Sequence, residues 1–245
     1  MKSILVLPFV LALPVFAGTS AKQVIPPPAN PCLMSWFVGA SVGYLTELEE
    51  PMYTVHAGIT NSCWMVGGWN VSAYAEVGYT QKDEDYREQG RENYKPLNVG
   101  KGNSFSVDEM GHALQYLATY NGIYHNQWDT NTGYDLDIVP ITLNVKLERA
   151  LSGNLNAYFG GGLGVACVSL DIDGGGYYGS FSDTAWVFCG QIFAGLSYSV
   201  SPVFEIYGGA RWMYLSDADV SDKGESATLE LGSDCFLELG ARYKF

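Results

Sequence analysis

Apolar side chains recur at every second position along most of this chain, in segments of about ten residues. The clearest segment has one apolar face, formed by Val139, Ile141, Leu143, Val145 and Leu147. Polar residues alternate with them at 142, 144, 146 and 148. Successive side chains of a β-strand point to opposite faces, so this period of two predicts strands. Similar strands are predicted at 155–165 and 237–245, and at about 35–45, 52–60, 70–82, 185–200 and 203–216.

The polar faces of these strands carry charged residues in mid-strand rather than only at the strand ends. Six residues have this property: Glu76, Lys146, Glu205, Arg211, Glu238 and Arg242. Glycines such as Gly160 and Gly209 are interleaved with them, and a glycine weakens a strand that faces bulk water. A narrow barrel, in contrast, needs small inward residues and paired internal charges. The pattern favours a closed barrel with its apolar face toward lipid, and a soluble secreted β-sandwich binding protein is the less favoured alternative.

Two further patterns agree with a barrel that spans a membrane. Aromatic residues lie near the predicted strand ends, where interfacial girdles form: Trp36, Tyr44, Trp69, Tyr79, Trp186, Tyr198, Trp212, Tyr214, Tyr243 and Phe245. Tight turns at 150–154 and 199–202 alternate with long polar connections at 83–133, 171–184 and 217–230. This predicts short turns on the periplasmic side and long loops outside. Two connections depart from the pattern: 46–51 is a short outer loop, and 61–69 is predicted to be a longer inner turn.

The start of the chain has the features of an export signal. Lys2 precedes a short apolar run that stops at Ala17, so residues 1–17 are predicted to be a cleaved signal peptide, with cleavage after Ala21 as the second choice. A Pro-rich periplasmic segment is expected at 18–34, followed by the barrel domain at 35–245. No later stretch reaches the roughly eighteen uncharged apolar residues of a membrane helix. These features predict the bacterial outer membrane as the location.

The last strand, 237–245, and the preceding run Tyr207-Gly208-Gly209-Ala210-Arg211 resemble the small outer-membrane β-barrel superfamily. This superfamily includes the OmpA transmembrane domain, OmpX and the opacity proteins. The resemblance covers about 35–245 and implies an all-β, closed, antiparallel, up-and-down transmembrane barrel of eight strands. Ten strands is the alternative, because 113–120 also alternates. By the same resemblance, Tyr243 and the terminal Phe245 correspond to the signal read by the barrel assembly machinery.

The sequence contains only weak matches to catalytic or metal-binding motifs. None of the three histidines begins the His-x-Ser pair of lipid A deacylases, and His125 with Asp129 is only a loose version of the Asp-His couple of outer-membrane proteases. The spaced carboxylates at 171–173 and 217–222 lack the spacing of a calcium loop. We therefore predict no enzyme, no catalytic residues, no metal and no cofactor. The net charge of −13 makes nucleic acid an unfavourable partner.

The cysteines and the loops complete the expectations. Cys32 and Cys63 both belong to the periplasmic end, where a disulfide between them is the hypothesis. Cys167, Cys189 and Cys235 have no evident partner. The predicted function is a structural anchor or surface-interaction protein, and a narrow porin-like channel is the alternative. Acidic loops rich in tyrosine would face outward and would contact surface glycans or proteins of a host or neighbouring cell. The tyrosines expected to make these contacts are Tyr86, Tyr94, Tyr177 and Tyr178. Outer-membrane lipid, lipopolysaccharide and the assembly machinery are the other expected partners.

Overall fold

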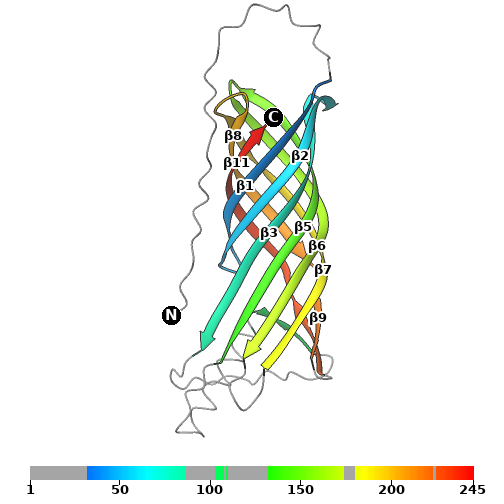
Figure 1. Ribbon diagram of the computed structural model, residues 1–245, viewed down its shortest axis with the longest axis vertical. Coiled ribbons are helices and arrows are strands. Elements are labelled where there is room, and N and C mark those ends of the chain that lie inside the picture. The colour runs from blue at the N-terminus through cyan, green and yellow to red at the C-terminus, as the bar shows by residue number, and fades with distance from the viewer. Residues whose placement is uncertain (1–31, 87–102, 108, 110–131, 174–179, 223–224) are drawn as a thin grey trace, which may run out of the picture. The chain divides into compact units, whose positions relative to one another are not determined.

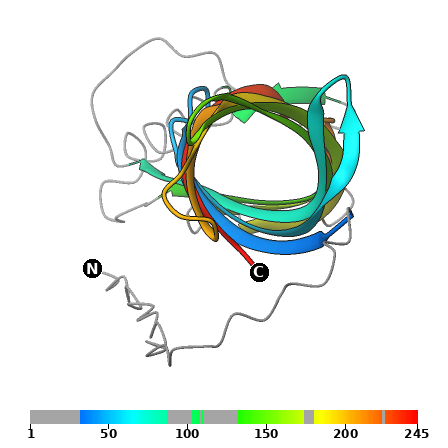
Figure 2. The same ribbon diagram turned by 90° about the horizontal axis from the view of Figure 1, so that it is seen from above.

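Eight antiparallel strands form a closed barrel in the computed structural model, which describes residues 32–86, 103–107, 109, 132–173, 180–222 and 225–245 (Figures 1 and 2). The strands are β1 (Met34–Leu45), β2 (Pro51–Val66), β3 (Trp69–Tyr86), β5 (Thr132–Ser152), β6 (Leu155–Asp173), β7 (Ser180–Ser199), β8 (Phe204–Leu215) and β11 (Gly232–Lys244). Pairing of β1 with β11, from Phe37 opposite Lys244 to Leu45 opposite Phe236, closes the ring. The eight-strand barrel is confirmed, and the stretch 113–120 lies outside the described residues.

The side chains alternate between the inside and the outside of this barrel as predicted. Leu143 is 73% exposed and Leu163 is 65% exposed, whereas Glu76 is 4% and Arg211 is 3% exposed. A soluble sandwich would bury the leucines and expose the charges. The observed distribution is the reverse, and it excludes the sandwich.

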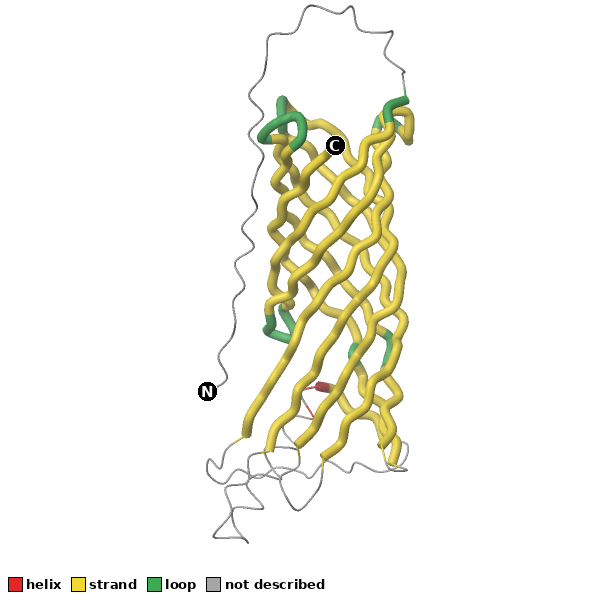
Figure 3. Tube along the Cα trace, in the orientation of Figure 1, coloured by secondary structure: helices red, strands yellow, loops and turns green. Residues whose placement is uncertain are grey.

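The two ends of the barrel differ. We call one end the turn end: it carries the C-terminus and the β2–β3, β5–β6 and β7–β8 connections, and it is at the top of Figure 1. We call the opposite end the loop end. Strands β3, β5, β6 and β7 have 18, 21, 19 and 20 residues, so they are longer than predicted and continue past β8 at the loop end. Nearly all of the described trace is strand (Figure 3). Among the described residues, no helix has the length and hydropathy needed to span a membrane.

The connection at 61–69 is not the longer turn that we predicted. Strands β2 and β3 continue to a two-residue turn at Gly67 and Gly68, which have φ angles of 58° and 82°. Positive φ at both central positions is typical of a type I′ hairpin, and glycine adopts it without strain. The extra residues lie instead in an irregularity of β2, where the register shifts between Thr60 and Met65.

The predicted loop 217–230 also contains regular structure. It forms the hairpin of β9 (Ala218–Asp222) and β10 (Glu225–Glu230), and β4 (Asn103–Ser106) adds to β10 in parallel. Val107, Ala218 and Leu229 of this region pack against buried side chains from the barrel. The small sheet therefore covers the barrel interior at the loop end. Its residues are mostly polar, so the sequence pattern predicted a loop. Their strand conformation depends on packing against the barrel.

Candidate functional site

The barrel interior brings together residues from all eight strands, and a central ionic cluster crosses it. Arg211 of β8 donates through Nη1 to Glu76 of β3, and its Nη2 donates to Glu238 Oε2 of β11 at 2.8 Å. Gln191 Nε2 of β7 donates to Glu76 Oε1 at 3.2 Å. Charge pairing with shared hydrogen bonds offsets the cost of burying these ions. The predicted residues Glu76, Arg211 and Glu238 thus meet in one cluster.

A second ionic cluster lies toward the turn end. Arg242 Nη2 is 2.9 Å from Glu205 Oε1, and Lys244 Nζ donates to Glu205 Oε2 at 2.6 Å. Lys146 pairs with Glu148, which also faces Arg242 at 3.9 Å. Sequence reasoning placed Lys146, Glu205 and Arg242 in the lumen and missed Glu148 and Lys244 as members. Both lie on the same polar faces, so strand alternation carried the signal for them.

An aromatic layer separates the two ionic clusters. Six strands each contribute one ring: Phe37, His56, Tyr74, Tyr158, Phe193 and Tyr207. The Arg242 guanidinium lies 4.9 Å from the Phe37 centroid, and the Arg211 guanidinium lies 5.5 Å from the Phe193 centroid. Cation–π contacts of this kind stabilise a desolvated cation. We did not predict this layer, although alternation places Tyr74 on the same strand face as Glu76 and Tyr207 on the same face as Arg211.

The interior becomes apolar toward the loop end, contrary to the expected polar lumen. The inward residues there include Leu136, Ile138, Val168, Val187 and Met213, all buried. On the same strands the outward positions become polar, as at Asp135 and Asp171, which are exposed. Burial of apolar side chains away from water is the arrangement of a soluble β-protein. The barrel therefore changes its polarity along its axis, and the switch on β5 lies near Ile138.

Little space remains between the aromatic layer and the ionic clusters. The cavity enclosed there has a volume of about 20 Å³, enough for about one water molecule. His56 Nδ1 and Tyr158 Oη are buried beside it and have no hydrogen-bond partner among the described residues. The clusters and the aromatic layer together fill the middle of the lumen.

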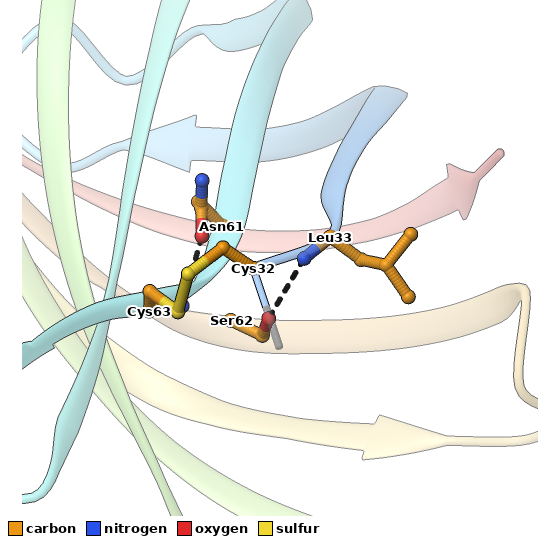
Figure 4. Close-up of a disulfide and its surroundings, with 5 residues drawn as sticks. All are labelled: Cys32, Leu33, Asn61, Ser62 and Cys63. Carbon is orange, nitrogen blue, oxygen red and sulfur yellow. Dashed lines mark hydrogen bonds between the residues drawn. A yellow bond between two sulfur atoms is a disulfide. The ribbon is translucent and has the colours of Figure 1, made fainter. Parts of the chain in front are cut away.

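A disulfide joins Cys32 to Cys63 at the turn end (Figure 4). The irregular part of β2 places Cys63 beside Cys32, which lies two residues before β1. Leu33 N donates to Ser62 Oγ at 3.1 Å, and Cys63 N donates to Asn61 Oδ1 at 2.8 Å. These contacts attach the β2 irregularity to the start of the barrel domain.

The remaining predicted positions are placed as follows. Cys167, Cys189 and Cys235 are free thiols. Tyr243 and Phe245 are exposed and stacked, with centroids 6.4 Å apart, and their role in assembly stays a prediction. Several loop residues named above lie outside the described residues: Tyr94, His125, Asp129, Tyr177 and Tyr178. In the described part of the chain, no group of acids, histidines and cysteines is arranged to hold a metal ion.

The chain matches no protein-family model and no curated protein sequence. Among solved structures it is similar to a major outer membrane protein from Thermus thermophilus, with a TM-score of 0.55 at 12% identity, covering 87% of this chain and 100% of that one. Neisserial surface protein A gives a TM-score of 0.44 at 14% identity, covering 87% and 99%. The outer membrane protease OmpT from Escherichia coli gives 0.39 at 8%, covering 88% and 98%.

Identities this low concern the fold alone. The chain has the fold of the small outer-membrane β-barrels, which confirms at that level the resemblance in its last strands. A fold shared at 12% identity does not decide between an enzyme and a non-enzyme.

Proposed function

We propose that this protein is a non-conducting barrel of the bacterial outer membrane, which anchors and presents a surface at its loop end. The observation that carries the proposal is the filled lumen. Arg211 connects Glu76 to Glu238 across the barrel, and buried apolar side chains occupy the interior beyond it. An eight-stranded barrel has an interior just wide enough for side chains, so ions would need a large rearrangement to pass.

The outer surface supports a lipid environment. Exposed apolar residues such as Leu143, Leu163 and Leu239 form its middle, and aromatic residues lie toward both ends, as at Trp36 and Trp186. A lipid bilayer favours this combination of an apolar band and aromatic girdles. Residues 1–17 would direct export and then be cleaved, and Tyr243 with Phe245 would direct assembly.

Outer-membrane barrels have short turns on the periplasmic side and long loops outside. We therefore propose that the turn end faces the periplasm and the loop end faces the medium. The connections between β3 and β5 and between β6 and β7 would then contact lipopolysaccharide or the glycans and proteins of another cell surface. We propose that the protein is not an enzyme. His56, the histidine within the described residues, is buried inside the barrel, and the sequence does not contain the His-x-Ser pair.

Planar-bilayer recording on the refolded mature chain tests the proposal. We expect no steady conductance at protein amounts at which a known porin gives channels. Outer-membrane fractionation and heat-modifiable migration on semi-native gels should accompany the recording, because they show that the silent sample is folded. Steady unitary channels from the folded barrel would favour the narrow porin-like alternative, and recovery of the protein without detergent would contradict membrane residence.

A further inference from the structure

A hollow lies at the turn end of the barrel, on the side of the turn-end ionic cluster away from the aromatic layer. It has a volume of about 270 Å³. We call it the vestibule. Its wall carries hydroxyl and amide groups, including those of Ser35, Asn61 and Ser72. Arg242 and Lys244 also line it, together with one carboxylate, Glu148, which is paired with Lys146. Hydroxyl, amide and cationic donors in one hollow are the groups that hold an anion.

The charges behind this wall do not balance. The turn-end cluster contains three cations, Lys146, Arg242 and Lys244, and two carboxylates, Glu148 and Glu205, so 3 − 2 leaves one positive charge. The central cluster has the opposite excess, with two carboxylates and one arginine. One monovalent anion in the vestibule would balance the side-chain charges of the turn-end cluster.

An unpaired donor accompanies this excess charge. Arg242 is buried, and its Nε has no hydrogen-bond partner among the described residues. Lys244 keeps part of its side chain open to solvent, with a relative exposure of 28%, and its ammonium carries three donors. A buried guanidinium donor without a partner is unfavourable, and the residue that carries it lines the vestibule.

We propose that the vestibule binds a carboxylate, presented by a small periplasmic molecule or by the carboxyl terminus of a peptide. The periplasmic source rests on the orientation proposed above. A carboxylate carries the single negative charge that the cluster lacks, together with acceptor oxygens for Lys244 and the nearby hydroxyls.

Two further observations concern the source of the ligand and the wall of the vestibule. Residues 18–31, which precede the disulfide, contain no Asp or Glu, so that segment has no side-chain carboxylate to offer. The Cys32–Cys63 disulfide holds Leu33 and Asn61, both of which line the vestibule (Figure 4). A wall held in place before binding reduces the entropy lost on binding.

Nuclear magnetic resonance titration of the folded, isotope-labelled barrel in zwitterionic detergent micelles tests this. The probes are sodium acetate, tetraglycine, tetraglycine amide and inorganic phosphate, all at constant ionic strength. We expect saturable shifts of the Ser35, Asn61 and Ser72 amides with acetate or tetraglycine and none with the amide. Tighter binding of tetraglycine than of acetate points to a peptide terminus, and the reverse points to a small molecule. Saturation by phosphate alone, or no saturation by any probe, overturns the proposal.

Matched variants locate the site. Lys244→Gln should weaken carboxylate binding roughly tenfold, the effect of losing one charged hydrogen bond. Arg149→Gln removes a charge from the exposed outer side of the same end and should leave binding unchanged. Phe37 pairs with Lys244, and Ser35 lies two residues from Phe37 on the same face of β1. Ser35→Asp therefore introduces a carboxylate close to Lys244, and this variant should no longer show saturable binding of acetate or tetraglycine.

Heat-modifiable migration must show that each variant is folded. Equal affinity in Lys244→Gln and Arg149→Gln would overturn the proposal. The micelle titration does not depend on orientation or conductance, so its failure is distinguishable from failure of the proposed function.

Discussion

At the scale of single residues, the aromatic layer explains some of the inward glycines, and Gly209 is one of them. Gly209 of β8 lies opposite Gly195 of β7, and a Cβ at Gly209 would be 2.6 Å from the Tyr158 hydroxyl. The preceding residue, Gly208, faces outward, and a Cβ there would meet nothing closer than 3.4 Å. Gly209 therefore provides space for a ring from another strand, and Gly208 does not.

Gly209→Ala should destabilise the barrel by about 1–3 kcal/mol, the usual cost of overpacking. The measurement is urea unfolding of the barrel in lipid vesicles, followed by tryptophan fluorescence. Gly208→Ala is the matched control and should leave the unfolding midpoint unchanged. Equal midpoints for the two variants would contradict this account of the interior.

The central arginine allows a sharper test of charge pairing. Arg211→Met would leave Glu76 and Glu238 buried without a counter-ion, which should cost about 3–5 kcal/mol in the same unfolding experiment. Combining it with Glu76→Gln and Glu238→Gln removes the unpaired charges and should recover much of the loss. A triple variant no more stable than the single variant would show that packing, rather than charge, sets the effect.

At the scale of elements, the short β1–β2 connection is organised by a residue from another strand. Asp234 of β11 accepts hydrogen bonds from Thr46 N at 2.9 Å, Thr46 Oγ1 at 3.0 Å, Glu47 N at 2.9 Å and Leu48 N at 3.0 Å. A carboxylate that satisfies several backbone donors stabilises a tight turn. Sequence reasoning missed Asp234, because its partners are distant along the chain, with Thr46 separated from it by 188 residues.

Asp234→Ala should therefore loosen this turn, with a loss of about 1–3 kcal/mol from the unpaired donors. Hydrogen exchange of the Thr46, Glu47 and Leu48 amides is the direct measurement, and it should accelerate while exchange in β6 stays slow. Asp217→Ala removes the same charge from an exposed position and serves as the control. Unchanged protection in Asp234→Ala would mean that other contacts hold the turn.

At the scale of the whole molecule, the reversal of polarity along the axis defines the part that lipid would surround. A spanning strand needs about 9–11 residues, and the longest four strands have 18 to 21. On β6, Leu163 and Asp171 point outward on the same face, but only the first lies in the apolar band. The end of β6 that carries Asp171 would thus stand in water.

Leu163→Arg should destabilise the folded barrel in lipid vesicles by about 2–4 kcal/mol, because it places a charge in the hydrocarbon. Asp171→Arg introduces the same side chain eight residues along the same face and should change stability little. Vesicle unfolding measures both variants. A similar cost for both would contradict the proposed limit of the lipid band.

Much of the fold followed from the sequence, because strand alternation is a local property of neighbouring residues. It placed Leu143 outside and Glu76 inside before any pairing was known. The hairpin in 217–230 and the irregularity in β2 were not predictable in this way. Each depends on distant partners: the hairpin packs on the barrel interior, and the β2 irregularity carries Cys63 to Cys32.

By itself, the sequence determined the strands, their two faces and the charges on the inner face, since all three depend on residues adjacent along the chain. The tertiary structure alone decided which charges meet, the order of the interior layers and the unbalanced cluster at the vestibule. Register and ring closure set these contacts. They bring Arg211 to Glu76 across 135 residues, a separation over which alternation carries no information.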